Sequence, residues 1–348
     1  MNDEKEINST GSSPKDDVFT TELPTEETTE TSEDALADLS IETIDVVSAD
    51  LSMEESVAEA SDLVEMSDIY ESSIYSCFAL KVKGASHIRD NTNCQDSFKI
   101  STIDVDDKTA IIATVADGHG SKKYYLSEFG ACILTDCLQN VLHNILQKKD
   151  ANFIDIMYKR IKEELPMKLF TTWSTNVLED YSHRVENGNE CEMESELDIL
   201  VKYGTTAMFC VSYENSLLFG KLDGNIVVVE DDECYEPICD DDDLMGSEAY
   251  SMCNRENALN KWNFGISHSS DFLTVSTDGL RNAFGDDDDN TSFLEAIKTI
   301  NEYIKTHEIE ETRQSLPPFL RRCSDNGSAD DITLVCFSKK PEGTDNNG

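Results

Sequence analysis

Basic residues are scarce in this sequence. The chain has 28 Lys and Arg against 71 Asp and Glu, and its formal net charge is −43. So acidic a chain repels phosphate backbones and anionic lipid headgroups, because like charges oppose the association that a basic surface would favour. We therefore expect neither nucleic acid nor a membrane as a partner, whereas cations and basic surfaces remain compatible.

Long apolar runs and paired cysteine motifs are also missing. The longest such run, Ala110 to Ala116, is far shorter than the ~20 residues of a membrane span. Residues Met1 to Thr10 are acidic and polar, unlike a secretory signal. The 11 cysteines are odd in number and form no Cys-x-x-Cys pair, which favours buried thiols in a reducing compartment over disulfides or zinc. These absences predict a soluble, cytoplasmic protein.

Aromatic residues are nearly absent from the first part of the chain. Residues 1–74 hold 22 Asp and Glu against 2 Lys, a net charge of −20. Such a segment cannot bury enough apolar surface to offset its ordering entropy. We predict a disordered N-terminal arm over residues 1–74, a folded domain over 75–339 and a short flexible tail over 340–348. Within the arm, Leu36 to Met66 is either a transient helix that docks on a partner or a solubilising stretch.

The rest of the chain mixes strand-like and helix-like patterns. Apolar periodicity predicts a helix from Leu126 to Ile145, a second over Phe153 to Tyr181 that is interrupted at Pro166, and a third capped by Thr291. The mixture predicts an α+β domain with helices outside antiparallel sheets, in which 205–230 forms one meander. Strands are predicted over 76–82, 96–103, 109–116, 205–213, 216–221, 225–230, 262–267, 271–276 and 331–338.

Carboxylates stand at the ends of three of these strands. Asp117-Gly118 and Asp278-Gly279 each follow an apolar strand, and Asp330-Asp331 opens the last one. An Asp-Gly pair is most often a tight turn, but a helix follows Asp117-Gly118, so we expect this turn to point into a cleft. Mg²⁺ and Mn²⁺ prefer carboxylate, carbonyl and water oxygens. The sequence therefore predicts a site for divalent metal ions.

The predicted site has an obvious chemical use. Two ions that share a bridging Asp can hold and deprotonate a water for in-line attack at phosphorus. His119 follows Asp117-Gly118 directly, so an imidazole that titrates near neutrality could protonate the departing alkoxide. The alternative is a turn histidine that hydrogen-bonds to backbone.

Several short motifs occur in a fixed order between Ser76 and Ser338. They are Gly84-Ala85-Ser86-His87, Asn93-Cys94-Gln95-Asp96, Val115-Ala116-Asp117-Gly118-His119-Gly120-Ser121, Tyr203-Gly204-Thr205-Thr206, Lys221-Leu222-Asp223-Gly224-Asn225, Ser276-Thr277-Asp278-Gly279-Leu280 and Asp330-Asp331-Ile332-Thr333. Each motif alone is weak, but their joint order resembles a known family, the metal-dependent serine/threonine protein phosphatases of type 2C, and most of all its bacterial branch.

The resemblance implies a four-layer α-β-β-α sandwich, in which two antiparallel sheets are flanked by helix pairs and a two-metal site lies at one end. Carried over position by position, Asp117 would bridge two Mg²⁺ or Mn²⁺ ions and Gly118 would offer its carbonyl to one of them. Asp278 and Asp330 would complete the second ion. Asp96 would hold a metal directly or through water.

The chain departs from the family at two positions. Gln95 stands where many members have Glu, and a neutral amide is a poorer metal ligand. The family's phosphate-binding Arg falls at Asn91, so Arg89 or His87 must replace it. We expect Arg89, because a guanidinium binds phosphate in a bidentate manner.

The resemblance implies hydrolysis of phosphoserine or phosphothreonine on proteins, without a covalent phosphoenzyme. His119 and Asp117 would be the catalytic residues, a phosphorylated protein the substrate and a cognate serine/threonine kinase the opposing partner. Gln95 and the displaced Arg also suggest a catalytically weak or silent adaptor that binds phosphoproteins. An enzyme for small phosphate esters or nucleotides is a further alternative, disfavoured by the lack of a Gly-x-x-x-x-Gly-Lys-Ser/Thr loop. The arm, as at Thr25 to Ser32, could be a regulatory kinase target.

Overall fold

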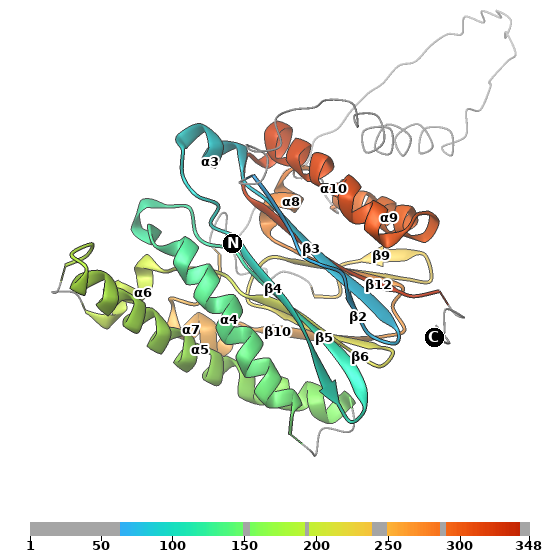
Figure 1. Ribbon diagram of the computed structural model, residues 1–348, viewed down its shortest axis with the longest axis horizontal. Coiled ribbons are helices and arrows are strands. Elements are labelled where there is room, and N and C mark those ends of the chain that lie inside the picture. Colours follow the sequence, from blue (N-terminus) through green and yellow to red (C-terminus); the bar gives the residue numbers. More distant parts are fainter. Residues whose placement is uncertain (1–62, 149–153, 192–194, 239–248, 286–289, 342–348) are drawn as a thin grey trace, which may run out of the picture. The chain divides into compact units, whose positions relative to one another are not determined.

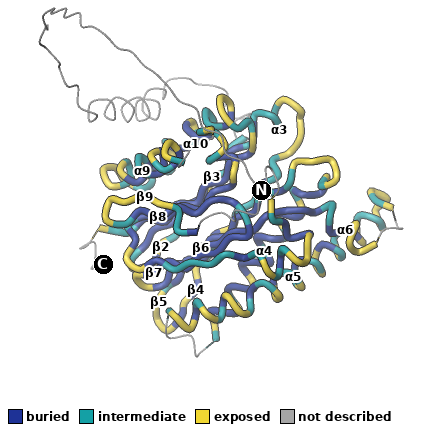
Figure 2. Tube along the Cα trace, turned by 180° about the vertical axis from the view of Figure 1, so that it is seen from behind, coloured by how far each residue is buried: buried dark blue, intermediate teal, exposed yellow. Residues whose placement is uncertain are grey.

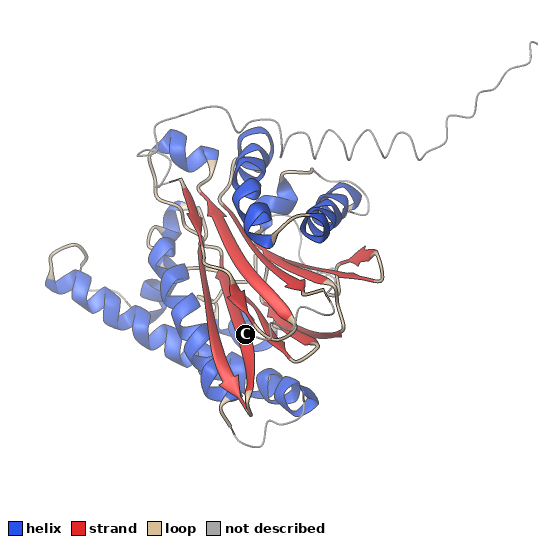
Figure 3. Cartoon of the chain, turned by 45° about the vertical axis from the view of Figure 1, so that its right-hand side comes forward, coloured by secondary structure: helices blue, strands red, loops and turns tan. Residues whose placement is uncertain are grey.

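The computed structural model describes residues 63–148, 154–191, 195–238, 249–285 and 290–341. In this part of the chain two antiparallel sheets face each other and helices cover the outer side of each sheet (Figures 1 and 3). The predicted α-β-β-α sandwich is thereby confirmed.

The first sheet has the strand order β10-β7-β6-β5-β4 within the described residues. All of its neighbouring strands pair antiparallel. Its strands are β4 (Ser97–Val105), β5 (Lys108–Ala116), β6 (Met208–Tyr213), β7 (Ser216–Lys221) and β10 (Asn263–His268).

The second sheet has the order β1-β3-β12-β11-β8-β9, with β2 paired to β3 beside this path. The central partners β3 and β12 pair along their whole length, from Tyr75–Lys339 to Val82–Ile332. Its strands are β1 (Val64–Met66), β2 (Tyr70–Glu71), β3 (Tyr75–Val82), β8 (Asn225–Glu230), β9 (Glu233–Tyr235), β11 (Phe272–Ser276) and β12 (Ile332–Lys339).

The expected meander over residues 205–230 is wrong. Strands β6 and β7 form the predicted hairpin, but β8 pairs with β11 and β9 in the other sheet. The chain therefore crosses between sheets at Leu222 to Gly224, where Gly224 has φ +96°. Apolar periodicity identifies a strand but carries no information about which neighbour accepts its hydrogen bonds.

Helices cover both sheets. On one side α4 packs on β4 and β5, and α5 packs on α4, while on the other side α10 packs on β3 and α9 on β8. None of the helices in the described residues is long and apolar enough to cross a membrane. The helices are α3 (Ala85–Asp90), α4 (Ser127–Leu146), α5 (Ile154–Glu186), α6 (Glu196–Lys202), α7 (Arg255–Asn260), α8 (Asp278–Asn282), α9 (Thr291–Thr306) and α10 (Ile309–Cys323).

Proline misled the helix predictions. Pro166 does not interrupt α5, because Leu165 and Leu169 on either side are fully buried and their packing outweighs the lost backbone hydrogen bond. Helix α10, which contains Pro317 and Pro318, was not expected at all. The short helices α3, α6 and α7 fall in segments for which the sequence predicted neither helix nor strand. The N-cap position of α9 is Asn290 rather than Thr291, and the Asn290 side chain makes no capping hydrogen bond.

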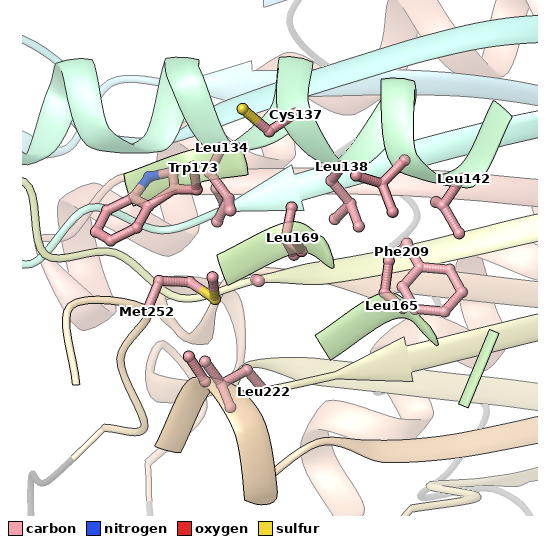
Figure 4. Close-up of a cluster of buried hydrophobic side chains, with 14 of the residues drawn as sticks. Leu134, Cys137, Leu138, Leu142, Leu165, Leu169, Trp173, Phe209, Leu222 and Met252 are labelled. Atoms are coloured by element: carbon pink, nitrogen blue, oxygen red, sulfur yellow. The ribbon is translucent and has the colours of Figure 1, made fainter. Parts of the chain in front are cut away.

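The apolar core lies in three layers. One lies between the two sheets, and one lies between the second sheet and helices α9 and α10. The third joins the first sheet to α4 and α5, and in it Trp173 lies beside Leu134 while Phe209 lies near Leu142 (Figure 4). The Trp173 indole N–H donates to the Gly130 carbonyl at 3.2 Å, so its one polar atom is satisfied. Along the chain the strands are mostly buried, whereas the outer helix faces are exposed (Figure 2).

The folded part begins earlier than the predicted boundary at residue 74. Strands β1 and β2 pair with β3. The Ser67 N–H donates to the Ala79 carbonyl, and the Ala79 N–H donates to the Ser67 hydroxyl, both at 2.9 Å. Val64 and Ile69 pack against the core beneath α9 and α10. The composition of this segment did not indicate strands, because its few apolar residues stand among many acidic ones. Residues 1–62 of the predicted arm and 342–348 of the predicted tail lie outside the described residues.

We expect the segment 63–74 to contribute to stability. A chain that starts at Tyr75 loses strand pairing and apolar burial that a chain starting at Leu63 keeps, and its free energy of unfolding should be lower by about 2–4 kcal/mol. Urea unfolding of the two chains measures the difference. Equal free energies would show that β1 and β2 are not part of the stable fold.

Candidate active site

Carboxylates from both sheets line one pocket. Its volume is about 950 Å³, and Asp117, Asp223, Asp278 and Asp330 all belong to its lining. We call it the carboxylate pocket. Asp117 follows β5 of the first sheet, Asp278 follows β11 and Asp330 precedes β12 of the second, so the pocket lies where strand ends of both sheets meet.

The backbone of Asp117 is clamped to the segment before β6. Its carbonyl accepts hydrogen bonds from the Thr206 N–H and the Thr205 hydroxyl, both at 2.8 Å, and its own N–H donates to the Thr206 hydroxyl at 3.0 Å. Gly118 forms a β-bridge with Thr205. The clamp keeps the Asp-Gly turn from rotating, which aims the carboxylate at a fixed point.

Three glycines let the acidic segments approach one another. A Cβ on Gly118 would lie 2.6 Å from the Gln95 carbonyl oxygen, and one on Gly279 would lie 2.1 Å from that of Asp331. A Cβ on Gly84 would meet the Asp330 carbonyl carbon at 2.6 Å. Any side chain at these positions would push apart the backbone segments that bring the carboxylates together.

Asp330 and Asp331 have different tasks. The Asp331 carboxylate is 3% exposed and accepts the N–H groups of Gly84 at 2.6 Å and Gln95 at 2.7 Å, and the His87 ring at 2.8 Å. Burial alone would raise the pKa of Asp331, but the hydrogen bonds from His87, Gln95 and Gly84 lower it. Asp331 thus ties the segment after β3 to β12, and Asp330 is left to face the pocket.

Asp96 lies behind the pocket. It is 5% exposed and is not among the lining residues, and its Oδ2 accepts the hydroxyls of Thr277 at 2.9 Å and Thr333 at 2.8 Å. These threonines flank Asp278 and Asp330. Asp96 therefore anchors both motifs from below, and its predicted contact with a metal stays a prediction.

The gathered carboxylates repel one another. Burial, followed by the charges of Asp96, Asp278 and Asp330, raises the pKa of Asp117 well above its usual range. Burial and Asp331 do the same for Asp96, and burial and Asp278 raise the pKa of Asp330 to about 6. Each shift favours the neutral acid, and a nearby cation would reverse it.

The donor set suits hard divalent ions that keep part of their water. No three Asp, Glu, His or Cys side chains among the described residues form a ready-made ligand set for one ion. Mg²⁺ needs no such set, because it usually takes one or two carboxylates and retains several waters. The Gln95 Oε1 is buried near these acids and accepts no hydrogen bond from the described residues. It could accept one from an ordered water. The residues present therefore fit the predicted ions.

His119 reaches the pocket but does not titrate as expected. Burial and the nearby Lys123 lower its pKa to about 4, so the predicted titration near neutrality is wrong and the ring is neutral at physiological pH. Its backbone N–H donates to the Gly204 carbonyl at 3.1 Å, and its ring packs 4.6 Å from that of Tyr124. The buried Nε2 has no hydrogen-bond partner in the described structure. The alternative of a turn histidine that hydrogen-bonds to backbone therefore explains the contact of the His119 N–H, but it gives no role to the imidazole ring.

Arg89 and His87, the expected phosphate-binding residues, are not among the residues that line the pocket. Arg89 lies exposed on α3 and pairs with Asp90 at 3.0 Å, while His87 is bound to Asp331. The sequence predicted neither helix nor strand between residues 83 and 95, whereas the segment forms the short helix α3, on which the Arg89 side chain is exposed.

Asp223, Lys123 and Arg255 are among the lining residues that the sequence analysis missed. Asp223 had been taken only for a turn and a motif position, but its carboxylate lies in the pocket and accepts the Tyr250 N–H at 2.8 Å. Lys123 and Arg255 also line the pocket, although they lie far apart in the sequence. Lys123 follows β5, and Arg255 is the first residue of α7. Lys123 follows His119 by four residues, which is the one signal that could have identified it; Arg255 has none.

Comparison with known proteins agrees with this geometry. The family model for protein phosphatase 2C matches residues 83–321. No curated protein sequence matches the chain.

Solved structures share the fold at low identity. A point variant of a bacterial serine phosphatase has a TM-score of 0.50 at 15% identity, covering 79% of this chain and 100% of that one. The serine/threonine phosphatase Stp1 from Staphylococcus aureus has a TM-score of 0.46 at 16% identity, with 76% and 95% covered. The catalytic domain of the phosphatase PstP, solved with 2 manganese ions, has a TM-score of 0.47 at 14% identity, with 77% and 99% covered.

Replacing Gly279 should disrupt the pocket without touching a carboxylate. In Gly279→Ala the new methyl group would displace Asp278 from Asp330, and Mn²⁺ affinity measured by calorimetry should fall about 10- to 100-fold. Gly120→Ala is the matched control, because its Cβ would meet no heavy atom closer than 3.7 Å. Equal affinities in the two variants would contradict the role of this close approach.

The raised carboxylate pKa values predict a pH dependence. Because burial and Asp278 raise the pKa of Asp330 to about 6 from the 3.8 of an unperturbed aspartate, between these two pH values the folded state holds a proton that the unfolded chain has lost. The free energy of unfolding without metal should therefore fall as pH rises through this range. Mn²⁺ binds the ionised form, so it should raise Tm more at about pH 7.5 than at about pH 5. Thermal scans with and without Mn²⁺ measure this, and a larger gain at the lower pH would refute it.

Proposed function

Because the chain belongs to the protein phosphatase 2C family, we propose that it hydrolyses phosphoserine or phosphothreonine on proteins with the aid of Mg²⁺ or Mn²⁺. The family acts on phosphorylated proteins, and its model matches residues 83–321 of this chain. The observation that carries the proposal is the meeting of Asp117, Asp278 and Asp330 from two sheets in one pocket.

The chain's own acids would hold the ions. Asp117 would bridge two of them, Asp278 and Asp330 would complete one, and the Gly118 carbonyl and Asp96 would contribute further oxygens. Bound there, the ions would neutralise phosphate charge and lower the pKa of a coordinated water. The clustering of raised-pKa carboxylates supports this assignment, since bound cations would offset their repulsion at a pH where the acids are ionised.

The protein groups around this centre orient the reactants. The clamp from Thr205 and Thr206 fixes Asp117, and the ties from Gly84 and Gln95 to Asp331 fix the segment that carries Asp330. Such preorganised positions reduce the reorganisation needed during reaction.

His119 acts in this proposal as a neutral hydrogen-bonding group. With a pKa of about 4 it is not an imidazolium acid at neutral pH. Its unpartnered Nε2 would instead hold the leaving oxygen of the serine or threonine through a hydrogen bond. Tyr124 and Gly204 hold the ring in place for this contact.

A silent adaptor explains the pocket less well. A protein that only binds phosphoproteins has no need for buried carboxylates that raise one another's pKa and destabilise the fold. The remaining expectations concern the cell: a cognate serine/threonine kinase, a cytoplasmic location and a regulatory role for the acidic N-terminal arm.

The function is tested by phosphate release from a phosphothreonine peptide. Purified protein should release phosphate with Mn²⁺ and stop when Mn²⁺ is chelated. Asp117→Asn and Asp278→Asn should each lower kcat/KM about 100-fold or more, because the ions supply several kcal/mol of stabilisation.

Asp107→Asn is the matched control for these variants. Asp107 is an exposed turn residue with φ 65°, a conformation that Asn also adopts, so its replacement should leave turnover unchanged. Tight Mn²⁺ binding without any phosphate release would favour the adaptor, and faster turnover of a nucleotide than of the phosphopeptide would favour the small-ester enzyme.

A further inference from the structure

We propose that Lys123 is the residue that binds the substrate's phosphoryl group, in place of the arginine that the family supplies from the segment before Asp96. This inference rests on the proposed function and names a binding residue for it. It starts from a mismatch: the chain needs a cation at the phosphate, and the two residues expected from the sequence do not line the pocket.

The carboxylate pocket needs positive charge from the protein. A phosphate monoester is a dianion near neutral pH. The acidic residues of the lining repel it, and they are Asp117, Asp223, Glu256, Asp278 and Asp330. Metal ions offset part of this repulsion. A protein cation that hydrogen-bonds to the phosphoryl oxygens would offset more of it and fix their orientation.

Two cationic side chains stand among the described residues that line the pocket, Lys123 and Arg255. Arg89 is excluded by its exposed position beside Asp90, and His87 by its bond to Asp331. The choice therefore lies between a lysine after β5 and an arginine at the first residue of α7.

Lys123 is linked to the reacting centre by direct contacts. Its Nζ lies 4.5 Å from the centre of the Tyr124 ring, and that ring lies 4.6 Å from the ring of His119. Gly204 leaves room for this stack, because a Cβ there would meet Tyr124 at 2.5 Å and His119 at 2.9 Å. Ammonium, aromatic ring and imidazole thus form a packed series beside Asp117.

The turn that carries Lys123 is held in position. The Tyr124 N–H donates to the Ser121 carbonyl at 2.8 Å, and the Leu126 N–H donates to the Lys202 carbonyl at 3.0 Å. A flexible lysine on a fixed turn can reach the phosphoryl oxygens while its stem stays on the tyrosine.

Arg255 comes from a different segment of the chain. In that segment the Tyr250 N–H is bound to Asp223 and the Met252 N–H to the Thr205 carbonyl at 2.9 Å, which ties the segment to the strand ends. Among the described residues, no hydrogen bond, ion pair or ring contact links Arg255 to His119 or Asp117, whereas the Tyr124 ring links Lys123 to His119.

The test measures phosphate binding separately from turnover. Inorganic phosphate is titrated into the Mn²⁺-loaded full chain by calorimetry, and KM is measured with a phosphothreonine peptide. Lys123→Met should weaken phosphate binding and raise KM about 10- to 100-fold, the loss expected for a charge-assisted hydrogen bond. Lys123→Arg should restore most of the binding.

Two controls separate binding from structure. Lys122→Met removes the neighbouring charge, which does not line the pocket, and should bind phosphate as the wild type does. Mn²⁺ affinity and Tm of Lys123→Met should match the wild type, since the lysine touches substrate and not the ions.

Three results would overturn the proposal: unchanged phosphate binding in Lys123→Met, an equal loss of Mn²⁺ affinity in that variant, or a loss of phosphate binding in Arg89→Met or Arg255→Met instead. A wild type that binds phosphate through Lys123 but releases none from phosphopeptide would sink the phosphatase proposal and leave this one intact.

Discussion

The repulsion between buried carboxylates is the constraint on which this structure depends. Asp96, Asp117 and Asp330 all have raised pKa values because the protein holds them near one another and away from water. Such an arrangement destabilises the fold unless cations neutralise it. A protein retains an unfavourable cluster of this kind when the cluster has a use, and binding divalent ions is the use that fits acids at the meeting point of two sheets.

The sandwich overcomes the repulsion by fixing backbone rather than by pairing charges. The glycines at 84, 118 and 279 allow main-chain contacts that any side chain would prevent. Asp331 accepts three hydrogen bonds and so acts as a tie, which leaves Asp330 beside it free to face the pocket. The two adjacent acids therefore have different roles: Asp331 accepts structural hydrogen bonds, and Asp330 is a candidate metal ligand.

Local patterns in the sequence predicted the strands and the carboxylates well, because an apolar run that stops at Asp-Gly reports both at once. They did not predict that β8 changes sheet, since periodicity does not specify a partner. They also placed a break at Pro166, where burial of α5 outweighs proline's preference. The pKa of His119 and the outward turn of Arg89 depend on neighbours distant in sequence or on a short helix, and no spacing rule contains that information.

In the proposed enzyme, Asp117, Asp278 and Asp330 jointly hold divalent ions. Anomalous diffraction from crystals grown with Mn²⁺ would locate these ions. We expect two manganese peaks in the carboxylate pocket, with oxygens of all three residues within about 2.2 Å of an ion and Asp117 shared between both. Manganese bound elsewhere, or a pocket in which these carboxylates contact no ion, would contradict the claim.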